Sequence, residues 1–302
     1  MSKIGAWINA ARLRTLPLSI SGILVGTGLA LYYGDFSWPI FVLAICTTVG
    51  FQITSNFAND YGDGVKGTDN DDRVGPKRAL QSGLLTRKSL KKGIIVSIVI
   101  NVLLVLLLLY FSFSKENLAL IIFFLVLGAL SIWAAIRYTV GDSAYGYSGL
   151  GDLFVFIFFG LVGVLGSMFL YIKTIPVLSF LPALAIGLLS VGVLNLNNLR
   201  DHISDKKAGK NTVVVKLGFA KAKKYHLYLL GISFFGLLSF VVFTHDSVHQ
   251  FMCLIAYVPI IVHAIKVKKT ESPARLDPEL KKLALSTFLL AILFCLAYHN
   301  FL

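Results

Sequence analysis

The sequence predicts an all-α protein: a membrane bundle of about nine transmembrane helices around a central cavity, capped by loops. Three observations predict it. Hydrophobic residues make up 56% of the 302 residues, the mean hydropathy is +0.78, and only 14% are charged, whereas soluble domains are about 25% charged. Apolar runs near the roughly 20 residues that a bilayer crossing needs recur along the whole chain. The segments between them alternate between short and long polar loops.

Each expected span is an apolar run that ends where polar or charged residues gather. We expect the spans, in order, at 15–33, 38–60, 92–113, 117–137, 151–171, 177–199, 224–243, 249–266 and 283–300. The motif NDYGD at 59–63 is weakly repeated as NNLRD at 197–201. This match is too short to establish a duplication, so we expect a single domain over residues 1–302.

The distribution of basic residues predicts the orientation in the membrane. Of the 28 Lys and Arg, 26 fall in the N-terminus and in the loops that alternation assigns to the same side, and Lys115 and Lys173 are the exceptions. The positive-inside rule therefore predicts a cytoplasmic N-terminus and cytoplasmic long loops. The same distribution explains the net charge of +13, because basic loops set the topology and contact the lipid bilayer. We therefore expect no nucleic-acid partner.

Two polar stretches directly follow apolar runs: SNFANDYGDGVKGTDNDD at 55–72 and LNLNNLRDHISDKKAGKN at 194–211. In the first, polar residues recur at i, i+3, i+4 and i+7; in the second, at i, i+3 and i+7. Residues at these spacings share one face of a helix. The residues concerned are Asn56, Asn59, Asp60 and Asp63, then Asn198, Asp201 and Asp205.

Carboxylates at membrane depth predict a bound cation. Insertion of one such residue costs about 2.5–3.5 kcal/mol, and these residues usually face an interior cavity. Mg²⁺ suits carboxylate and amide oxygens and commonly bridges to substrate phosphates. We therefore expect two acidic helices facing each other with Mg²⁺ and a diphosphate between them. An apolar surrounding favours a prenyl diphosphate. The alternative is a pair of solvated, inert helix ends.

The motifs NDYGD and NNLRDHISD resemble the two aspartate-rich motifs of the UbiA-type membrane prenyltransferase superfamily, with departures at Gly67 and Asn198. Longer segments at 59–86, 138–167 and 209–218 resemble its 1,4-dihydroxy-2-naphthoate polyprenyltransferases of menaquinone synthesis. The resemblance implies transfer of a polyprenyl group from polyprenyl diphosphate to 1,4-dihydroxy-2-naphthoate with loss of CO₂, at a bacterial plasma membrane.

The resemblance also implies roles for individual residues. Mg²⁺ would be held by Asp60, Asp63, Asp201 and Asp205. Phosphate contacts are expected from Lys66, Arg73 and Lys206. Asn56 and Asn59 could either contact the phosphate or bind the metal. Asn198 is a further candidate for the diphosphate site. The carboxylate of the acceptor needs a cationic or hydrogen-bonding partner, for which the candidates are Arg14, Arg137, Tyr138 and Tyr145.

Two alternatives stay open at this stage. A sibling prenyltransferase would use the same diphosphate chemistry on another aromatic acceptor, such as 4-hydroxybenzoate. A membrane transporter with acidic coordination sites is the alternative outside enzymes, although transporters usually bind near the bilayer midplane and these motifs lie at the ends of the expected spans.

Overall fold

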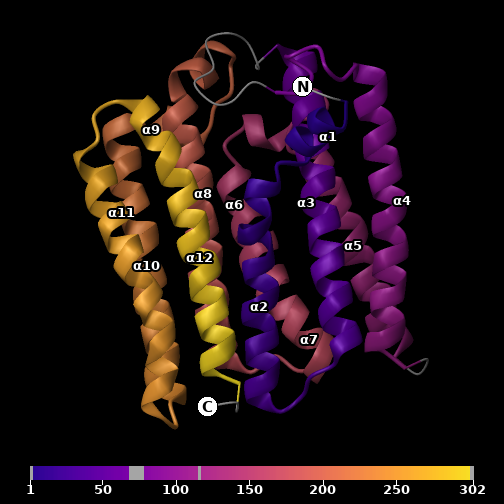
Figure 1. Cartoon of the computed structure of the whole chain (residues 1–302), viewed down its shortest axis with the longest axis vertical. Helices are drawn as coiled ribbons and strands as arrows, with labels where there is room; N and C mark the ends of the chain where they lie inside the picture. Colours follow the sequence, from indigo (N-terminus) through magenta and orange to yellow (C-terminus); the bar gives the residue numbers. More distant parts are fainter. Residues whose placement is uncertain (1–2, 68–77, 115–116, 300–302) are drawn as a thin grey trace.

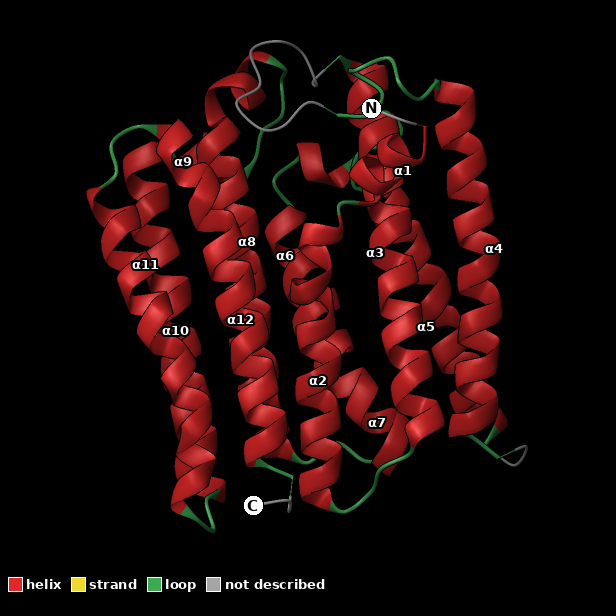
Figure 2. Cartoon of the chain, viewed as in Figure 1, coloured by secondary structure: helices red, strands yellow, loops and turns green. Residues whose placement is uncertain are grey.

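The computed structural model describes residues 3–67, 78–114 and 117–299, and every regular element in that part of the chain is a helix (Figure 2). Nine helical spans among these residues are long and apolar enough to cross a membrane. The predicted all-α membrane bundle is therefore confirmed. The spans are Ile4–Tyr33, Trp38–Lys66, Arg87–Ser112, Leu118–Arg137, Gly151–Ile172, Val177–Lys207, Phe219–Thr244, Val248–Lys269 and Pro273–Ala297.

The helices run roughly along the longest axis of the molecule, with the N-terminus at the top of Figure 1 and the C-terminus at the bottom. The first half contains α1 (Lys3–Ala11), η1 (Leu13–Thr15), α2 (Leu16–Tyr33), α3 (Trp38–Lys66), α4 (Arg87–Ser112), α5 (Leu118–Arg137) and η2 (Tyr145–Tyr147). The second half contains α6 (Gly151–Val155), η3 (Phe156–Gly166), α7 (Ser167–Ile172), η4 (Val177–Ser179), α8 (Phe180–Lys207), α9 (Val213–Leu217), α10 (Phe219–Thr244), η5 (Val248–Ala256), α11 (Tyr257–Lys269), η6 (Pro273–Leu276) and α12 (Asp277–Ala297).

The two helices that carry the acidic motifs extend beyond the predicted spans. Helix α3 continues past residue 60 to Lys66, and α8 continues past residue 199 to Lys207. The prediction ended each span where hydropathy falls, but backbone hydrogen bonding continues through the polar turns. Helix α3 ends at Gly67, whose φ of +71° is the left-handed conformation that commonly closes a helix. Both acidic motifs therefore lie on regular helix, which fixes their side chains on one face.

The span at 151–171 contains an unexpected element. Its central part, η3, is a π-helix of 11 residues between two short α-helices. Helix α2 packs directly on it. A Cβ added at Gly22 would lie 2.8 Å from the backbone oxygen of Phe159, and one added at Gly26 would lie 2.4 Å from that of Val164. Small residues allow this close approach of two backbones in a membrane bundle.

Helices α3 and α4 are joined by buried polar side chains. The Asn101 amide donates to the Thr54 hydroxyl at 2.8 Å, and Thr54 Oγ1 lies 2.9 Å from Ser97 Oγ. Interhelical hydrogen bonds of this kind contribute on the order of 0.6–2 kcal/mol in a membrane. They hold α3 in a fixed rotation, which matters because α3 carries the first acidic motif.

Candidate active site

A cavity of about 390 Å³ lies inside the bundle, between α2, α3, α4, α5, η3 and α8. Its two ends differ in character. One end is polar and is lined by Arg12, Asn56, Asn59, Asp63, Arg78, Tyr138, Asn197 and Lys210. The rest is mainly apolar and is lined by residues such as Ala44, Leu108, Leu109, Phe124, Phe158 and Leu170.

The cavity is elongated along the helices. Ala44 and Asn59 both line it and both lie on α3. They are 15 positions apart, which at 1.5 Å per residue corresponds to about 22 Å. The cavity therefore offers a charged head region and a long apolar region, and it suits a ligand with an anionic head and a hydrocarbon chain.

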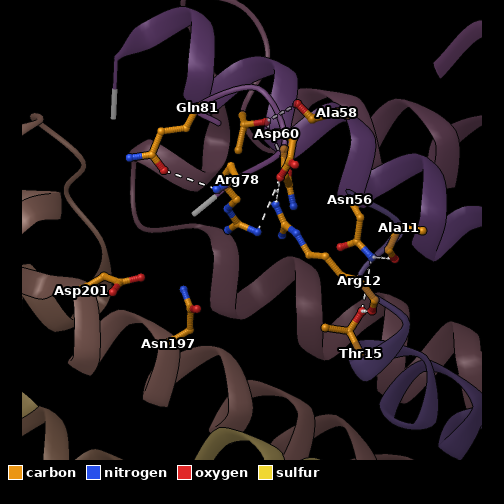
Figure 3. A network of polar contacts seen from close by, with 12 residues as sticks. Ala11, Arg12, Thr15, Asn56, Ala58, Asp60, Arg78, Gln81, Asn197 and Asp201 are labelled. Carbon is orange, nitrogen blue, oxygen red and sulfur yellow. Dashed lines mark hydrogen bonds and ion pairs between the residues drawn. The ribbon is translucent and has the colours of Figure 1, made fainter. Parts of the chain in front are cut away.

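Asp60 lies at the polar end and is almost completely buried. Arg12 donates to Asp60 Oδ1, and Arg78 Nη1 lies 3.5 Å from the same oxygen. Figure 3 shows the two arginine side chains converging on Asp60. The second carboxylate oxygen, Oδ2, is buried without a hydrogen-bond partner among the described residues. Two guanidinium groups facing one carboxylate leave positive charge available for an anionic ligand.

Asn56 positions the segment that carries Arg12. Its amide donates to the backbone oxygen of Ala11 at 2.8 Å and lies 3.3 Å from the Thr15 hydroxyl (Figure 3). Asn59, one turn further on, accepts a hydrogen bond from Thr139 at 3.3 Å. Both asparagines line the cavity, as the prediction of a ligand role requires, but both also make protein contacts.

Asp63 completes the face of α3. Its Oδ1 accepts a hydrogen bond of 2.8 Å from the hydroxyl of Tyr147, which lies at the end of η2. Lys66, one turn further along α3, is exposed, and its ammonium lies 4.0 Å above the centre of the Tyr147 ring. The aromatic face attracts that cation.

On α8, the second motif is held by Arg200. Its guanidinium donates to both oxygens of Asp201, at 2.8 and 2.6 Å, and to Asp277 at the start of α12 at 2.5 Å. It also donates to the Asn197 side chain at 2.9 Å. Asn198 is buried, and its Oδ1 lacks a hydrogen-bond partner within the described part of the chain.

Asp205 lies one turn after Asp201 and faces a lysine from beyond the helix. Lys210 Nζ is 3.8 Å from Asp205 Oδ1, and the backbone N–H of Lys210 donates to the Asp205 carbonyl at 2.8 Å. Burial by itself would lower the pKa of Lys210, but the charges of Asp63 and Asp205 raise it above its ordinary value. Lys210 is therefore a permanent buried cation on the wall of the cavity.

None of the predicted basic residues that the structure describes lines the cavity. The side chains of Arg14, Lys66 and Lys206 are exposed and do not line it, whereas Arg12 and Lys210 do. Arg137 also lies off the cavity and donates to Ser143 at 2.5 Å. Arg73 lies outside the described residues.

Tyr138 and Tyr145 do line the cavity, at the end of α5 and in the following loop. The Tyr145 ring stacks on Phe154 with 3.9 Å between ring centres and meets Tyr138 edge to face at 5.4 Å. The Tyr145 hydroxyl donates to the Ala134 carbonyl at 2.8 Å. Burial raises the pKa of Tyr138 to about 12, so its hydroxyl stays neutral at physiological pH.

The two acidic helices do not bring their carboxylates into one cluster. Among the described residues, no three His, Cys, Asp or Glu side chains form a group that could hold a metal ion. Each aspartate instead contacts a basic or phenolic side chain of this chain. Their chemistry nevertheless fits Mg²⁺, because they offer hard oxygen donors, and Asp60 Oδ2 and Asn198 Oδ1 are buried without a hydrogen-bond partner in the described residues.

Sequence reasoning missed Arg12, Arg78, Lys210 and Tyr147. Arg12 is 48 positions from Asp60 and Tyr147 is 84 positions from Asp63. The spacing within a helix carries no information on such long-range partners. The one usable signal was that each acidic stripe needs compensating positive charge at membrane depth.

This fold and site define a membrane-embedded helical bundle in which a charged pocket opens into an elongated apolar cavity. The UbiA prenyltransferase family matches residues 19–292. The chain belongs to that family and is a multi-pass membrane prenyltransferase.

Close relatives carry one name. The chain is 42% identical, over 98% of its length and 96% of the relative's, to the 1,4-dihydroxy-2-naphthoate octaprenyltransferase of Escherichia coli K12. It is 38% identical over 80% of its length, and 79% of the relative's, to the enzyme of that name from Mycobacterium tuberculosis H37Rv. These relatives are prenyltransferases of menaquinone biosynthesis.

Solved structures agree on the fold. A UbiA homologue from Archaeoglobus fulgidus bound to GPP and Mg²⁺ matches 97% of this chain and 98% of its own, with a TM-score of 0.72 and 14% sequence identity. The apo structure of a UbiA homologue from Aeropyrum pernix K1 matches 93% of this chain and 97% of its own, with a TM-score of 0.70 and 16% identity.

Proposed function

We propose that this protein transfers a polyprenyl group from polyprenyl diphosphate to 1,4-dihydroxy-2-naphthoate, with decarboxylation, to give demethylmenaquinol. The observation that carries the proposal is the cavity, which extends about 22 Å along α3 from its charged end into an apolar region. The 42% identity to a 1,4-dihydroxy-2-naphthoate octaprenyltransferase over nearly the full chain supports the acceptor and makes an octaprenyl donor the first to test.

The diphosphate would lie at the charged end. Arg12, Arg78 and Lys210 line the cavity there and supply positive charge. Asn56 and Asn59, which lie on α3, line the same end of the cavity and would offer amide groups to phosphate oxygens. A charge-assisted hydrogen bond to phosphate is roughly twice as strong as a neutral one, so we expect these three cations to contribute most of the affinity for the diphosphate.

Mg²⁺ would be held by Asp60 and Asp63 on α3 and by Asp201 and Asp205 on α8, with Asn198 as a further oxygen donor. Bound there, Mg²⁺ would neutralise the diphosphate and stabilise it as a leaving group. The acids now contact Arg12, Arg200, Lys210 and Tyr147. Arg12 and Lys210, which line the cavity, would be available to the phosphate oxygens with the carboxylates on the metal.

The acceptor ring would lie against Tyr138 and the Tyr145–Phe154 stack, between the charged end and the apolar region. These aromatic faces stabilise positive charge on the allylic carbon and exclude water from it. The Tyr138 hydroxyl, neutral because burial raises its pKa to about 12, would serve as a hydrogen-bond donor to the acceptor and not as a base. Arg14 and Arg137, which do not line the cavity, are weaker candidates for this contact.

The charged end would face the cytoplasm of a bacterial cell. The N-terminus and the described parts of the long loops lie at that end of the bundle (Figure 1). In the sequence, the N-terminus and the long loops carry nearly all of the Lys and Arg. Both proposed substrates would then enter from the side of the membrane on which basic loops are retained.

The test is an assay in nanodiscs with 1,4-dihydroxy-2-naphthoate, octaprenyl diphosphate and Mg²⁺, in which CO₂ and the prenylated naphthoquinol are followed together. We expect both products, their loss with EDTA, and a loss of at least about 100-fold in Asp60→Ala and Asp201→Ala, a size typical of groups that stabilise charge in the transition state. Asp246→Ala, at the opposite end of the bundle, is the matched control. Release of diphosphate without formation of the naphthoquinol, or faster turnover of 4-hydroxybenzoate, would refute 1,4-dihydroxy-2-naphthoate as the acceptor. The assignment of a polyprenyl diphosphate as the donor would stand.

A further inference from the structure

We infer that Tyr147 is the positioning residue that couples the two aspartate motifs, through its hydroxyl to the first and through its main chain and ring to the second. The inference rests on the proposed function, because it assigns the two motifs to one diphosphate site.

The coupling is needed because α3 and α8 do not pack closely against each other. Each motif is rigid within its own helix. Helix α2 packs against both helices, and at this end of the bundle the loop between α5 and α6 contacts both α3 and the segment after α8. A ligand that bridges both motifs requires their separation to be held within a few tenths of an ångström.

The first connection is the hydroxyl of Tyr147. It donates to Asp63 Oδ1 at 2.8 Å, and Asp63 is buried. A hydrogen bond to a buried carboxylate fixes which oxygen points toward the phenol and which remains for another ligand. Tyr147 thereby sets the rotamer of Asp63.

The second connection is the main chain around Tyr147. The N–H of Asn211 donates to the Tyr147 carbonyl at 3.0 Å, and the Lys216 ammonium donates to the Ser148 carbonyl at 2.8 Å. These bonds attach the segment after α8 to the loop. The same segment contains Lys210, whose N–H donates to the Asp205 carbonyl. Asp63 and Asp205 are thus joined through a short path of hydrogen bonds.

The third connection is the aromatic ring. The ammonium groups of Lys66 and Lys210 lie 4.0 and 5.4 Å from its centre. The ring therefore attracts one cation from α3 and one from the segment after α8. Lys210 lines the cavity, so the ring also determines where that positive charge stands relative to a phosphate.

The hydroxyl and the ring can be tested separately. Tyr147→Phe removes the bond to Asp63 and keeps the ring. Tyr147→Leu removes both. If Tyr147 positions the site, the first change weakens metal binding alone, and the second weakens binding of the metal and of the diphosphate. If Tyr147 only stabilises the loop, both substitutions would lower the melting temperature, and metal binding and diphosphate binding would not be affected separately.

The experiment measures Mn²⁺ binding by electron paramagnetic resonance in nanodiscs, with octaprenyl thiodiphosphate present. The KM for octaprenyl diphosphate and the melting temperature are measured for the same variants. For Tyr147→Phe we expect about tenfold weaker Mn²⁺ binding, the loss of one hydrogen bond to a charged group, with the KM within about twofold of wild type. For Tyr147→Leu we expect the KM to rise about tenfold as well. Tyr228→Phe, on an exposed face of α10, is the control.

Unchanged Mn²⁺ affinity in Tyr147→Phe would overturn the inference. So would equal losses in the two variants, because the ring would then have no separate role. If Tyr147→Leu does not fold, Tyr147→Trp retains an aromatic face without the hydroxyl and is expected to behave as Tyr147→Phe. The Mn²⁺ titration needs no acceptor, so failure to prenylate 1,4-dihydroxy-2-naphthoate would refute the proposed function separately.

Discussion

At the scale of residues, the candidate site is a set of acids that each contact a basic or phenolic side chain. Arg12 and Tyr147 come from distant parts of the chain, whereas Arg200 and Lys210 lie near their acids in sequence. Arg12 and Arg78 face Asp60, Arg200 holds Asp201, and Lys210 faces Asp205. Arg12, Arg78 and Lys210 line the charged end of the cavity, where the effective dielectric is lower than in water and charges interact strongly. A diphosphate can therefore exchange for the acids as the partner of these cations.

The choice between two lysines tests this arrangement. Lys206 is exposed, whereas Lys210 is buried on the cavity wall. We expect Lys210→Met to raise the KM for octaprenyl diphosphate by about tenfold or more, as the loss of a buried charged hydrogen bond implies. Lys206→Met should have a much smaller effect, because an exposed charge is screened. Steady-state kinetics of both variants in nanodiscs decides the point, and a larger effect for Lys206 would contradict the site described here.

At the scale of elements, the π-helix η3 and helix α2 form the wall of the cavity together. Gly163 and Gly166 of η3 line the cavity, and Gly22 and Gly26 let α2 approach η3 closely, with Gly22 next to Gly163. A π-helix widens the backbone and redirects side chains, which is why such elements recur at functional sites. The apolar run at 151–171 predicted a helix but carried no sign of this winding.

Gly26→Ala tests that contact. The new Cβ would lie 1.9 Å from Ser167 Oγ and 2.4 Å from the Val164 carbonyl, so one backbone has to move. We expect a loss of about 1–3 kcal/mol in stability, as for overpacked cores, seen as a lower melting temperature in nanodiscs. Gly231→Ala on α10, where nothing lies within 4 Å of the new Cβ, is the matched control. It should be neutral or slightly stabilising, and equal losses in both variants would argue against the tight contact.

At the scale of the whole molecule, the bundle has one charged end and one apolar interior. The cavity crosses much of that interior, and its walls come from both halves of the sequence. We propose that the prenyl chain extends along α3 from the charged end toward Ala44, which is buried at the far part of the cavity.

Ala44→Phe should therefore discriminate between prenyl donors by length. We expect it to raise the KM for octaprenyl diphosphate by about tenfold, the cost of roughly 1.4 kcal/mol in binding, because the ring fills space that the distal isoprene units need. Geranyl diphosphate is too short to reach Ala44 and should be little affected. Val42→Phe on the exposed face of the same helix is the control. An equal effect on both donors would place the chain elsewhere.

The orientation in the membrane is tested with paired cysteines in a background that lacks Cys46, Cys253 and Cys295. Ser82→Cys lies in the loop at the charged end, and Ser247→Cys lies in the loop before η5 at the other; both serines are exposed. Under the positive-inside rule, a membrane-impermeant maleimide should label Ser247→Cys in intact cells and Ser82→Cys only after lysis. The reverse pattern would overturn the proposed cytoplasmic site.

The sequence alone determined the class of fold and which acidic side chains share a helix face, because both depend on local patterns. Hydropathy over about 20 residues marks a span, and the spacing of Asp60 and Asp63 marks a helix face. Only the tertiary structure shows that Arg12, Lys210 and Tyr147 contact these acids, whereas Arg14 and Lys206 do not line the cavity. Arg12 and Tyr147 meet their partners across 48 and 84 positions of the chain, and Lys210 reaches Asp205 because the chain turns back directly after α8. A spacing of a few residues constrains direction on one helix, but it contains no information on which distant side chain lies opposite.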